Sequence, residues 1–235
     1  PQALSGGGRI PRPGEISLAH RGILFLDELP EFPRIALEVL RQPLENRKIL
    51  ISRSNYSEEF PADFLLLAAM NPCKCGYYPD MQRCTCTERE IHGYLHRISR
   101  PLLDRMDLSA EMSRIPFEEL WKKEREEVQE ENSAAIRSRV ERVQKLQLQR
   151  YEGTPYRFNG DLDSAGVQKY CVLGTEEEKI LEGMYRKFSL TARSCHRLLK
   201  VARTLADMDE SEKIRKKHLA EAAAFRQVSQ AAVYF

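Results

Sequence analysis

The 235-residue sequence lacks any long apolar run. No stretch approaches the roughly 20 apolar residues of a membrane-spanning helix, and no signal peptide opens the chain. We therefore expect no membrane association and a cytoplasmic location. The sequence also lacks an excess of either charge, since the net charge is only +2, so bulk charge neither favours nor excludes nucleic acid as a partner.

Two apolar runs predict neighbouring strands that end in polar residues. Ile23–Leu26 is a continuous apolar run, which is typical of a parallel strand covered on both faces, and Asp27 and Glu28 follow it directly. Residues 64–70 form a second such run, which stops at Asn71-Pro72. Because ligands bind at the carboxyl ends of parallel strands, we expect these polar side chains to share one edge of a sheet.

The residue types at this edge suit one chemistry. One carboxylate can hold Mg²⁺ through its water shell, a neighbouring carboxylate can polarise an attacking water, and an amide can fix that water. Hydrolysis of a nucleoside triphosphate requires this arrangement. The alternative for Asp27 and Glu28 is an acidic helix N-terminus that suits the helix dipole.

The remaining pattern predicts an α/β part followed by a helical part. A helix is expected from Pro33 to near Pro43, and residues 108–112 are a possible third strand. A β-hairpin is expected from Ile49–Arg53 and Tyr56–Phe60 around Ser54-Asn55. Helices are expected within 117–150, with Ser133 as a second N-cap, and at about 162–172, 175–187, 191–207 and 215–231, with a capping box at Thr175 and Glu178.

Four of the six cysteines are clustered in the sequence. Cys73 and Cys75 form one C-x-C pair, and Cys84 and Cys86 form a second pair eight residues later. Four thiolates can close a tetrahedral structural Zn²⁺ site, so we predict zinc here. The alternative is four reduced cysteines in a flexible loop. His92 and His96, at helix-like spacing, are possible further ligands, although surface positions are the simpler interpretation.

The order of these motifs resembles one family. GEISLAHRGILFLDELPEF, the hairpin, AAMNPCKCG and LLDRMDL together resemble the Mg-chelatase-type AAA+ ATPases, in particular the branch of bacterial competence proteins. The resemblance runs through nearly the whole chain. It implies a partial AAA+ P-loop-type parallel sheet core with a β-hairpin insertion at 1–115, a charged helical connector at 116–155 and an all-helical lid domain at 156–235.

The resemblance also implies roles for particular residues. It makes Asp27 the Mg²⁺-side carboxylate of the Walker B strand, Glu28 the catalytic carboxylate and Asn71 the sensor 1 residue. Arg105 matches the arginine finger, which is presented to the ATP of the neighbouring subunit. Arg193 matches the sensor 2 position of the lid. The hairpin matches the pre-sensor-1 hairpin that faces the pore in related motors. Without the resemblance, a salt bridge of Arg105 with Asp104 or Asp107 and a solvated Arg193 would be the simpler interpretations.

The phosphate-binding loop G-x-x-x-x-G-K-[ST] of such enzymes does not occur in the sequence. Residues 5–9 are Gly-rich but lack the Lys-Ser/Thr pair. In the family this loop precedes the matching region, so we expect it upstream of Pro1. We also expect the 235 residues alone to be unable to hydrolyse ATP.

The resemblance implies ATP and Mg²⁺ as cofactors and a homo-oligomeric ring, expected to be a hexamer. It implies a DNA-remodelling helicase such as one that drives branch migration in natural transformation. The alternatives are a Mg-chelatase-like ATPase that remodels a protein partner and a zinc-stapled, non-catalytic interaction module. Basic side chains that DNA phosphates could meet are Arg53, Arg137, Arg139, Arg142, Lys145 and those of residues 213–217.

Overall fold

The computed structural model describes residues 2–8, 10–53, 56–112, 115, 117 and 131–234. The chain divides into two compact units, residues 1–106 with 229–235, and residues 107–228. The first unit is mixed α/β and contains a small parallel sheet, whereas the second is helical in its described part. The prediction of an α/β part followed by a helical part is confirmed at this level.

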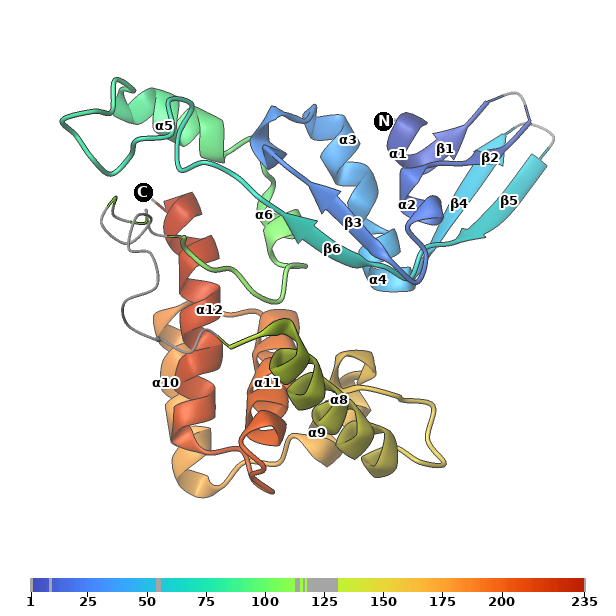
Figure 1. Cartoon of the computed structure of the whole chain (residues 1–235), viewed down its shortest axis with the longest axis vertical. Helices are drawn as coiled ribbons and strands as arrows, with labels where there is room; N and C mark the ends of the chain where they lie inside the picture. The colour runs from blue at the N-terminus through green and yellow to red at the C-terminus, as the bar shows by residue number, and fades with distance from the viewer. Residues whose placement is uncertain are drawn as a thin grey trace. The chain divides into compact units, whose positions relative to one another are not determined.

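The parallel sheet consists of the two strands that the apolar runs predict. Strand β3 (Ile23–Leu26) pairs with β6 (Leu65–Ala68) in parallel, with Ile23 opposite Leu65 and Leu26 opposite Ala68 (Figure 1). Backbone pairing continues past both strands, because the N–H of Ala69 donates to the carbonyl of Leu26 and the N–H of Leu29 donates to the carbonyl of Ala69, each at 2.9 Å. The carboxyl ends of the two strands therefore stay together beyond the sheet.

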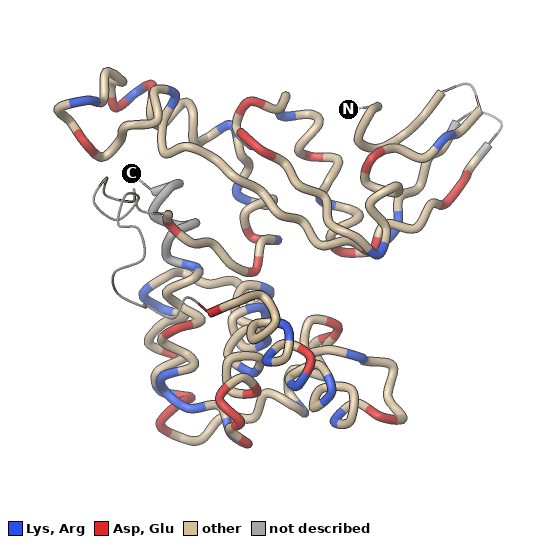
Figure 2. The backbone as a smooth tube through the Cα atoms, in the orientation of Figure 1, with Lys and Arg blue, Asp and Glu red and all other residues tan. Residues whose placement is uncertain are grey.

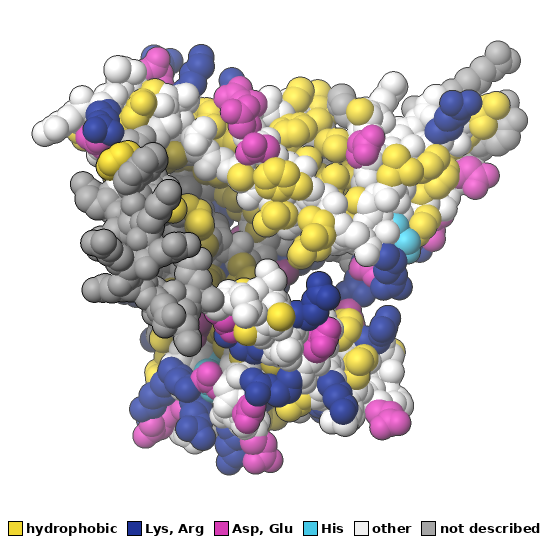
Figure 3. Space-filling view, in the orientation of Figure 1, with side chains coloured by type: hydrophobic (Ala, Val, Ile, Leu, Met, Phe, Trp, Pro, Cys, Tyr) yellow, Lys and Arg dark blue, Asp and Glu magenta, His cyan; other side chains and the backbone are white. Residues whose placement is uncertain are grey.

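Within the part of the chain that the structure describes, one face of this sheet is covered and the other is exposed. Leu24 and Leu26 are buried in a core with apolar residues of α2 (Glu15–Leu18) and α3 (Arg34–Glu38). On the other face, more than half of each apolar side chain is exposed, and Figure 3 shows hydrophobic side chains gathered over the sheet. The prediction that both faces are covered is therefore wrong for the described residues, since none of their elements packs there. The exposed side chains are Ile23, Phe25, Leu65 and Leu67.

The segment between the two sheet strands contains short helices and a hairpin. The predicted helix after Pro33 consists of α3, η2 (Val39–Arg41) and α4 (Pro43–Asn46), so Pro43 begins a helix rather than ending one. The predicted hairpin is confirmed, because β4 (Lys48–Arg53) pairs with β5 (Tyr56–Pro61) in antiparallel. Its expected turn, residues 54–55, lies outside the described residues. The other short elements are α1 (Gln2–Ser5), β1 (Gly6–Gly7), β2 (Arg12–Pro13) and η1 (Leu29–Glu31).

Two helices follow the sheet, α5 (Glu88–Leu95) and α6 (Arg100–Leu103). The predicted third strand at 108–112 is wrong, because these residues join no sheet ladder. Instead, Ser109 donates its N–H and its hydroxyl to the carbonyl of Phe225, at 2.9 and 2.6 Å. These bonds fix the segment to a helix, so its backbone is held without pairing to another strand.

The second unit contains the predicted helices with shifted ends. Helix α8 (Ser133–Arg150) is capped by Asn132, whose side chain accepts the N–H of Ala135, so the prediction of Ser133 as the cap is wrong. Helix α10 (Thr175–Lys187) begins after Gly174, so Thr175 is its first residue and cannot close the predicted capping box. The other elements are η3 (Asn159–Asp161), α9 (Ser164–Tyr170), α11 (Ala192–Met208) and α12 (Lys216–Tyr234).

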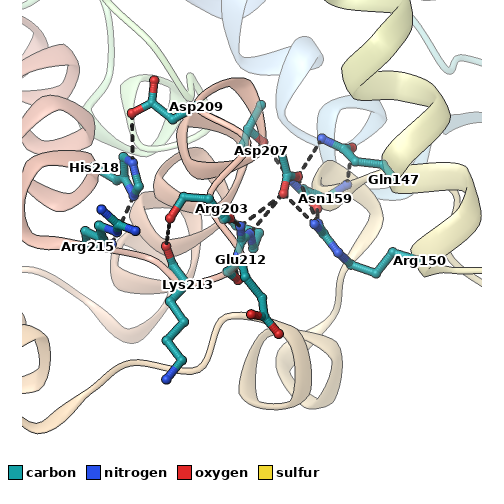
Figure 4. Close-up of polar contacts among 12 residues, drawn as sticks. Gln147, Arg150, Asn159, Arg203, Asp207, Asp209, Glu212, Lys213, Arg215 and His218 are labelled. Carbon is teal, nitrogen blue, oxygen red and sulfur yellow. Dashed lines mark hydrogen bonds and ion pairs between the residues drawn. The ribbon is translucent and has the colours of Figure 1, made fainter.

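A buried polar network holds α8, η3 and α11 together (Figure 4). The Asp207 side chain is fully buried and accepts hydrogen bonds from Arg150, Arg203, Gln147 and Asn159. The Arg150 and Arg203 guanidinium groups neutralise its charge, at 2.8 Å for one Arg150 nitrogen and 3.2 Å for Arg203 Nε. A buried carboxylate needs such partners, because an unpaired charge in the interior is costly.

No helix in the described part of the chain is long and apolar enough to cross a membrane.

Candidate functional site

The two carboxylates predicted to be functional lie where β3 ends. Asp27 and Glu28 are both exposed, and Asp27 accepts the backbone N–H of Glu28 at 2.9 Å. Glu28 adopts a left-handed backbone conformation, with φ of +50° and ψ of +46°, before the short η1 helix. Such a conformation costs a non-glycine residue about 1–3 kcal/mol and is concentrated at functional sites.

Asn71 lies at the same edge of the sheet. It follows β6 by three positions and is exposed, and the hydrogen bonds between residues 26, 29 and 69 hold its segment beside Glu28. The structure thus brings the carboxyl ends that carry Asp27, Glu28 and Asn71 together, as the sequence predicts. Two exposed carboxylates and an amide at one edge are a donor set that suits hydrated Mg²⁺ and a positioned water.

Arg105 makes its described contacts with its own unit. Its side chain is only 8% exposed, with Nη2 2.9 Å from a carboxylate oxygen of Glu45. Nε donates to the carbonyl of Arg41 at 3.2 Å, and Nη1 donates to the carbonyl of Pro101 at 2.6 Å. The acidic partner among these contacts is Glu45, rather than the Asp104 or Asp107 that the sequence alone suggests. In this conformation the guanidinium braces α4 against α6, and reaching a neighbouring subunit requires these bonds to break.

Arg193 lies in the second unit, in the first turn of α11, where Thr191 caps the helix by accepting the N–H of Ser194 at 3.1 Å. Arg193 is exposed at this helix start, and its role at the sensor 2 position stays a prediction.

The four clustered cysteines converge. Cys73, Cys75, Cys84 and Cys86 place all four sulfur atoms within 4.8 Å of one another, and Cys73 is fully buried. The Sγ atom of Cys73 lies 3.3 Å from that of Cys75 and 3.8 Å from that of Cys84. Among the described residues this is the one cluster of three or more His, Cys, Asp or Glu side chains that can hold a metal ion. The convergence of the sulfur atoms supports a metal site over four reduced cysteines in a flexible loop, and neither His92 nor His96 belongs to the cluster.

The thiols influence one another's protonation. A hydrogen bond from the backbone N–H of Tyr77 is the main factor that lowers the pKa of Cys75 to about 6. For Cys84, a backbone hydrogen bond from Cys86 lowers the pKa, but burial and the Cys75 and Cys73 sulfurs outweigh it and raise the value to about 12. The pKa of Cys86 is also raised. The Cys75 thiolate therefore forms readily, whereas a cation at the centre would favour the charged forms of Cys84 and Cys86.

Sequence reasoning missed several residues that support the site. Helix α5 was not expected, although Thr87 and Glu90 form a capping box, with the N–H of Glu90 donating to the Thr87 hydroxyl at 3.3 Å. Arg97 follows this helix, donates to the carbonyl of Pro30 at 3.1 Å and forms an ion pair with Glu31 at 2.9 Å. The T-x-x-E spacing was a usable signal for the helix, whereas the pairing of Arg97 with Glu31 joins positions too distant for any local pattern to reveal.

Comparisons with known proteins agree with this picture. Residues 1–120 match the family described as magnesium chelatase, subunit ChlI, and residues 130–226 match the family described as magnesium chelatase, subunit ChlI C-terminal. The chain therefore belongs to the magnesium chelatase ChlI family, and the resemblance drawn from the motifs is confirmed.

Individual relatives cover nearly the whole chain. It is 44% identical over 224 residues to competence protein ComM of Haemophilus influenzae, which covers 95% of this chain and 42% of that protein. It is 43% identical over 232 residues to the uncharacterized protein YifB of Escherichia coli, covering 99% of this chain and 44% of that protein. A magnesium-chelatase 67 kDa subunit of Chlorobaculum parvum is 30% identical over 69 residues, or 29% of this chain and 11% of that protein. The chain thus spans less than half the length of these relatives.

Proposed function

We propose that this chain is part of an AAA+ ATPase in which ATP hydrolysis takes place at the carboxyl edge of β3 and β6. The observation that carries the proposal is the parallel pairing of β3 and β6, whose carboxyl ends are followed by Asp27, Glu28 and Asn71, within a chain of the magnesium chelatase family. Asp27 would hold Mg²⁺ through its water shell, Glu28 would polarise the attacking water, and Asn71 would orient that water. Bound Mg²⁺ would neutralise charge on the phosphate oxygens.

The site needs groups beyond these three. A phosphate-binding loop would have to come from outside the 235 residues, so we propose that they are inactive alone. A charged group from a neighbouring subunit would complete the site, which is why we propose a ring, with six subunits as the expected number. Arg105 would supply that charge only after leaving Glu45, and Arg193 would contact the nucleotide from its helical unit.

A substitution of Glu28 tests the proposal. In a longer protein that contains the phosphate-binding loop, Glu28→Gln keeps the shape of the side chain but removes its charge. Nucleotide binding should persist, and turnover should fall by about 10²–10⁴-fold, the range typical of a lost general base. Glu15→Gln is the matched control, because Glu15 is an exposed carboxylate on α2 in the same unit. Turnover of Glu28→Gln equal to that of the control would remove Glu28 from this role.

We propose DNA as the substrate, in a reaction such as branch migration during natural transformation. The support is the relative named as a competence protein, which matches 95% of this chain. The surface gives less support, because Figure 2 shows Lys and Arg interspersed with Asp and Glu along the helices of residues 107–228. Several candidate basic side chains form ion pairs there: Arg139 with Glu131, Arg142 with Glu210, Lys216 with Glu176 and Lys217 with Asp209.

Binding of branched DNA at two salt concentrations tests this substrate. We expect affinity that falls steeply with salt and ATP turnover that rises on addition of the DNA. Absence of both effects would favour the second candidate, a motor that remodels a protein partner. That candidate is supported by the match of both parts of the chain to magnesium chelatase families.

We also propose Zn²⁺ as the metal of the cysteine cluster, because four sulfur ligands at these separations suit tetrahedral zinc.

A further inference from the structure

The first two cysteines of the cluster, Cys73 and Cys75, lie directly after the proposed catalytic edge in the chain. Cys73 follows Asn71 by two positions and begins a tight turn, in which the N–H of Gly76 donates to the carbonyl of Cys73 at 3.0 Å. Gly76 has φ of +80°, and a Cβ atom placed on it would lie 3.9 Å from Cγ of Asn71. The turn that carries Cys73 and Cys75 therefore comes close to the Asn71 side chain.

The last cysteine of the cluster, Cys86, is connected to the same edge through α5 and Arg97. Cys86 directly precedes Thr87, the N-cap of α5, so the last sulfur ligand is fixed to the start of that helix. Beyond the other end of α5, Arg97 holds both the carbonyl of Pro30 and the carboxylate of Glu31. These two residues lie two and three positions after Glu28, so α5 connects the cluster to the segment that follows the proposed catalytic carboxylate.

Packing alone holds this arrangement weakly. Residues 69–87 contain no helix or strand. Among the described residues, the apolar cluster around them buries Cys73, Ile91, Tyr94 and Leu95, with Cys75, Tyr78, Cys84 and Cys86 partly buried against it. Loops of this length without secondary structure are uncommon in compact domains and are usually either functional or disordered. A bound metal would supply a cross-link, since binding energy at a structural zinc site is also folding energy.

We propose that a zinc ion held by Cys73, Cys75, Cys84 and Cys86 sets the positions of Asn71 and Glu28. The ion fixes the Cys73–Gly76 turn against Asn71, and through α5 and Arg97 it fixes the Pro30-Glu31 segment that follows Glu28. The proposal rests on the proposed function for the catalytic meaning of those positions. The binding of the metal itself is independent of that function.

The metal is tested first, on protein purified without chelator. We expect about one zinc per chain. Cys75→Ala should lose the metal, whereas Cys75→His should retain it because zinc accepts three sulfurs and one imidazole nitrogen. Cys195→Ser is the matched control, since Cys195 lies outside the cluster on α11, and it should keep a full equivalent. Cobalt substitution should give the ligand-field bands of a tetrahedral tetrathiolate. Metal-free wild-type protein with the same thermal stability, or with disulfides among the four cysteines, would overturn the proposal.

The positioning role is tested by hydrogen exchange in wild-type protein before and after removal of zinc. We expect faster exchange within residues 69–76 and also at residues 29–32 and 88–97, with no change in the β4–β5 hairpin as internal reference. Faster hydrogen exchange confined to residues 73–86 would show that the metal orders only the loop that binds it. The positioning role would then be refuted. If Glu28→Gln leaves turnover intact while these exchange changes are seen, the proposed function fails and the metal-dependent order stands.

Discussion

Removal of the Asp207 carboxylate should destabilise the helical unit more than any exposed ion pair can. The Asp207 side chain is fully buried, and those of Arg203 and Arg150 are 5% and 22% exposed. In Asp207→Ala, both guanidinium groups and the Gln147 amide lose this acceptor, whereas the Asn159 amide keeps the Thr204 hydroxyl at 2.9 Å. Removing one partner of a buried ion pair costs about 3–5 kcal/mol.

The expected loss in the free energy of unfolding for Asp207→Ala lies at the lower end of that range, because the partly exposed Arg150 side chain can turn toward water. With a urea dependence of about 1–3 kcal/mol per molar, the midpoint of unfolding should fall by roughly 2 M. Far-ultraviolet circular dichroism follows this transition, because its signal comes mainly from the helices of residues 133–228.

The matched control is Glu182→Ala. Glu182 pairs with Arg186 at 2.6 Å on the surface of α10, with side chains that are 61% and 77% exposed. Solvent screening limits such a pair to about 0.3–0.5 kcal/mol, so the midpoint should hardly move. If Asp207→Ala costs less than about 1 kcal/mol, the network is not the structural centre of this unit, and the reasoning from its burial is refuted.

Four further predictions follow from the described contacts. Arg105→Ala should destabilise the first unit by about 1–3 kcal/mol, and Glu45→Ala should have a comparable effect in thermal unfolding, as expected for hydrogen bonds of a charged group. Thr87→Ala removes the capping box and should cost about 1 kcal/mol, seen as faster hydrogen exchange in α5. The Tyr156 hydroxyl and the backbone N–H of residue 166 lower the pKa of Asp163 in the folded state, so its stabilisation is present at neutral pH and is lost as the pH falls through that lowered value. Asp163→Asn should therefore flatten the acid side of the stability profile. Glu28→Gly should leave stability unchanged or raise it by up to about 1 kcal/mol in a urea titration, because glycine relieves the left-handed strain. In the longer protein that contains the phosphate-binding loop, the same substitution should abolish turnover.

Local, repeated patterns in the sequence predict the strands, the hairpin and the cysteine cluster correctly. Continuous apolar runs predicted β3 and β6, and two strand-like runs around a polar dipeptide predicted the β4–β5 hairpin. Clustered C-x-C pairs predicted converging sulfur atoms. The apolar run of β3 could not reveal that Phe25 is exposed, because such a run shows which side chains are apolar but not which of them are covered.

Features that depend on distant partners were not predictable in the same way. Residues 108–112 were read as a strand, but their fixed contact is with the carbonyl of Phe225, 116 positions from Ser109. Likewise, Asp207 is neutralised by Arg150, 57 positions earlier, and Arg105 by Glu45 rather than by an adjacent aspartate. Such pairs arise from the packing of whole elements, which no local spacing encodes.

The backbone at Glu28 links the fold to the proposed chemistry. Hydrogen bonds hold Leu29 to Ala69 and Ala69 to Leu26, so the chain must turn sharply within two residues after β3. A left-handed residue makes this turn, and glycine would do so at lower cost. The Asp27 carboxylate offsets part of the strain by accepting the N–H of Glu28, but the glutamate side chain stays exposed and has no stabilising role among the described contacts. A strained backbone that displays an exposed carboxylate at this edge supports the proposed role of Glu28, and this support is independent of the family match.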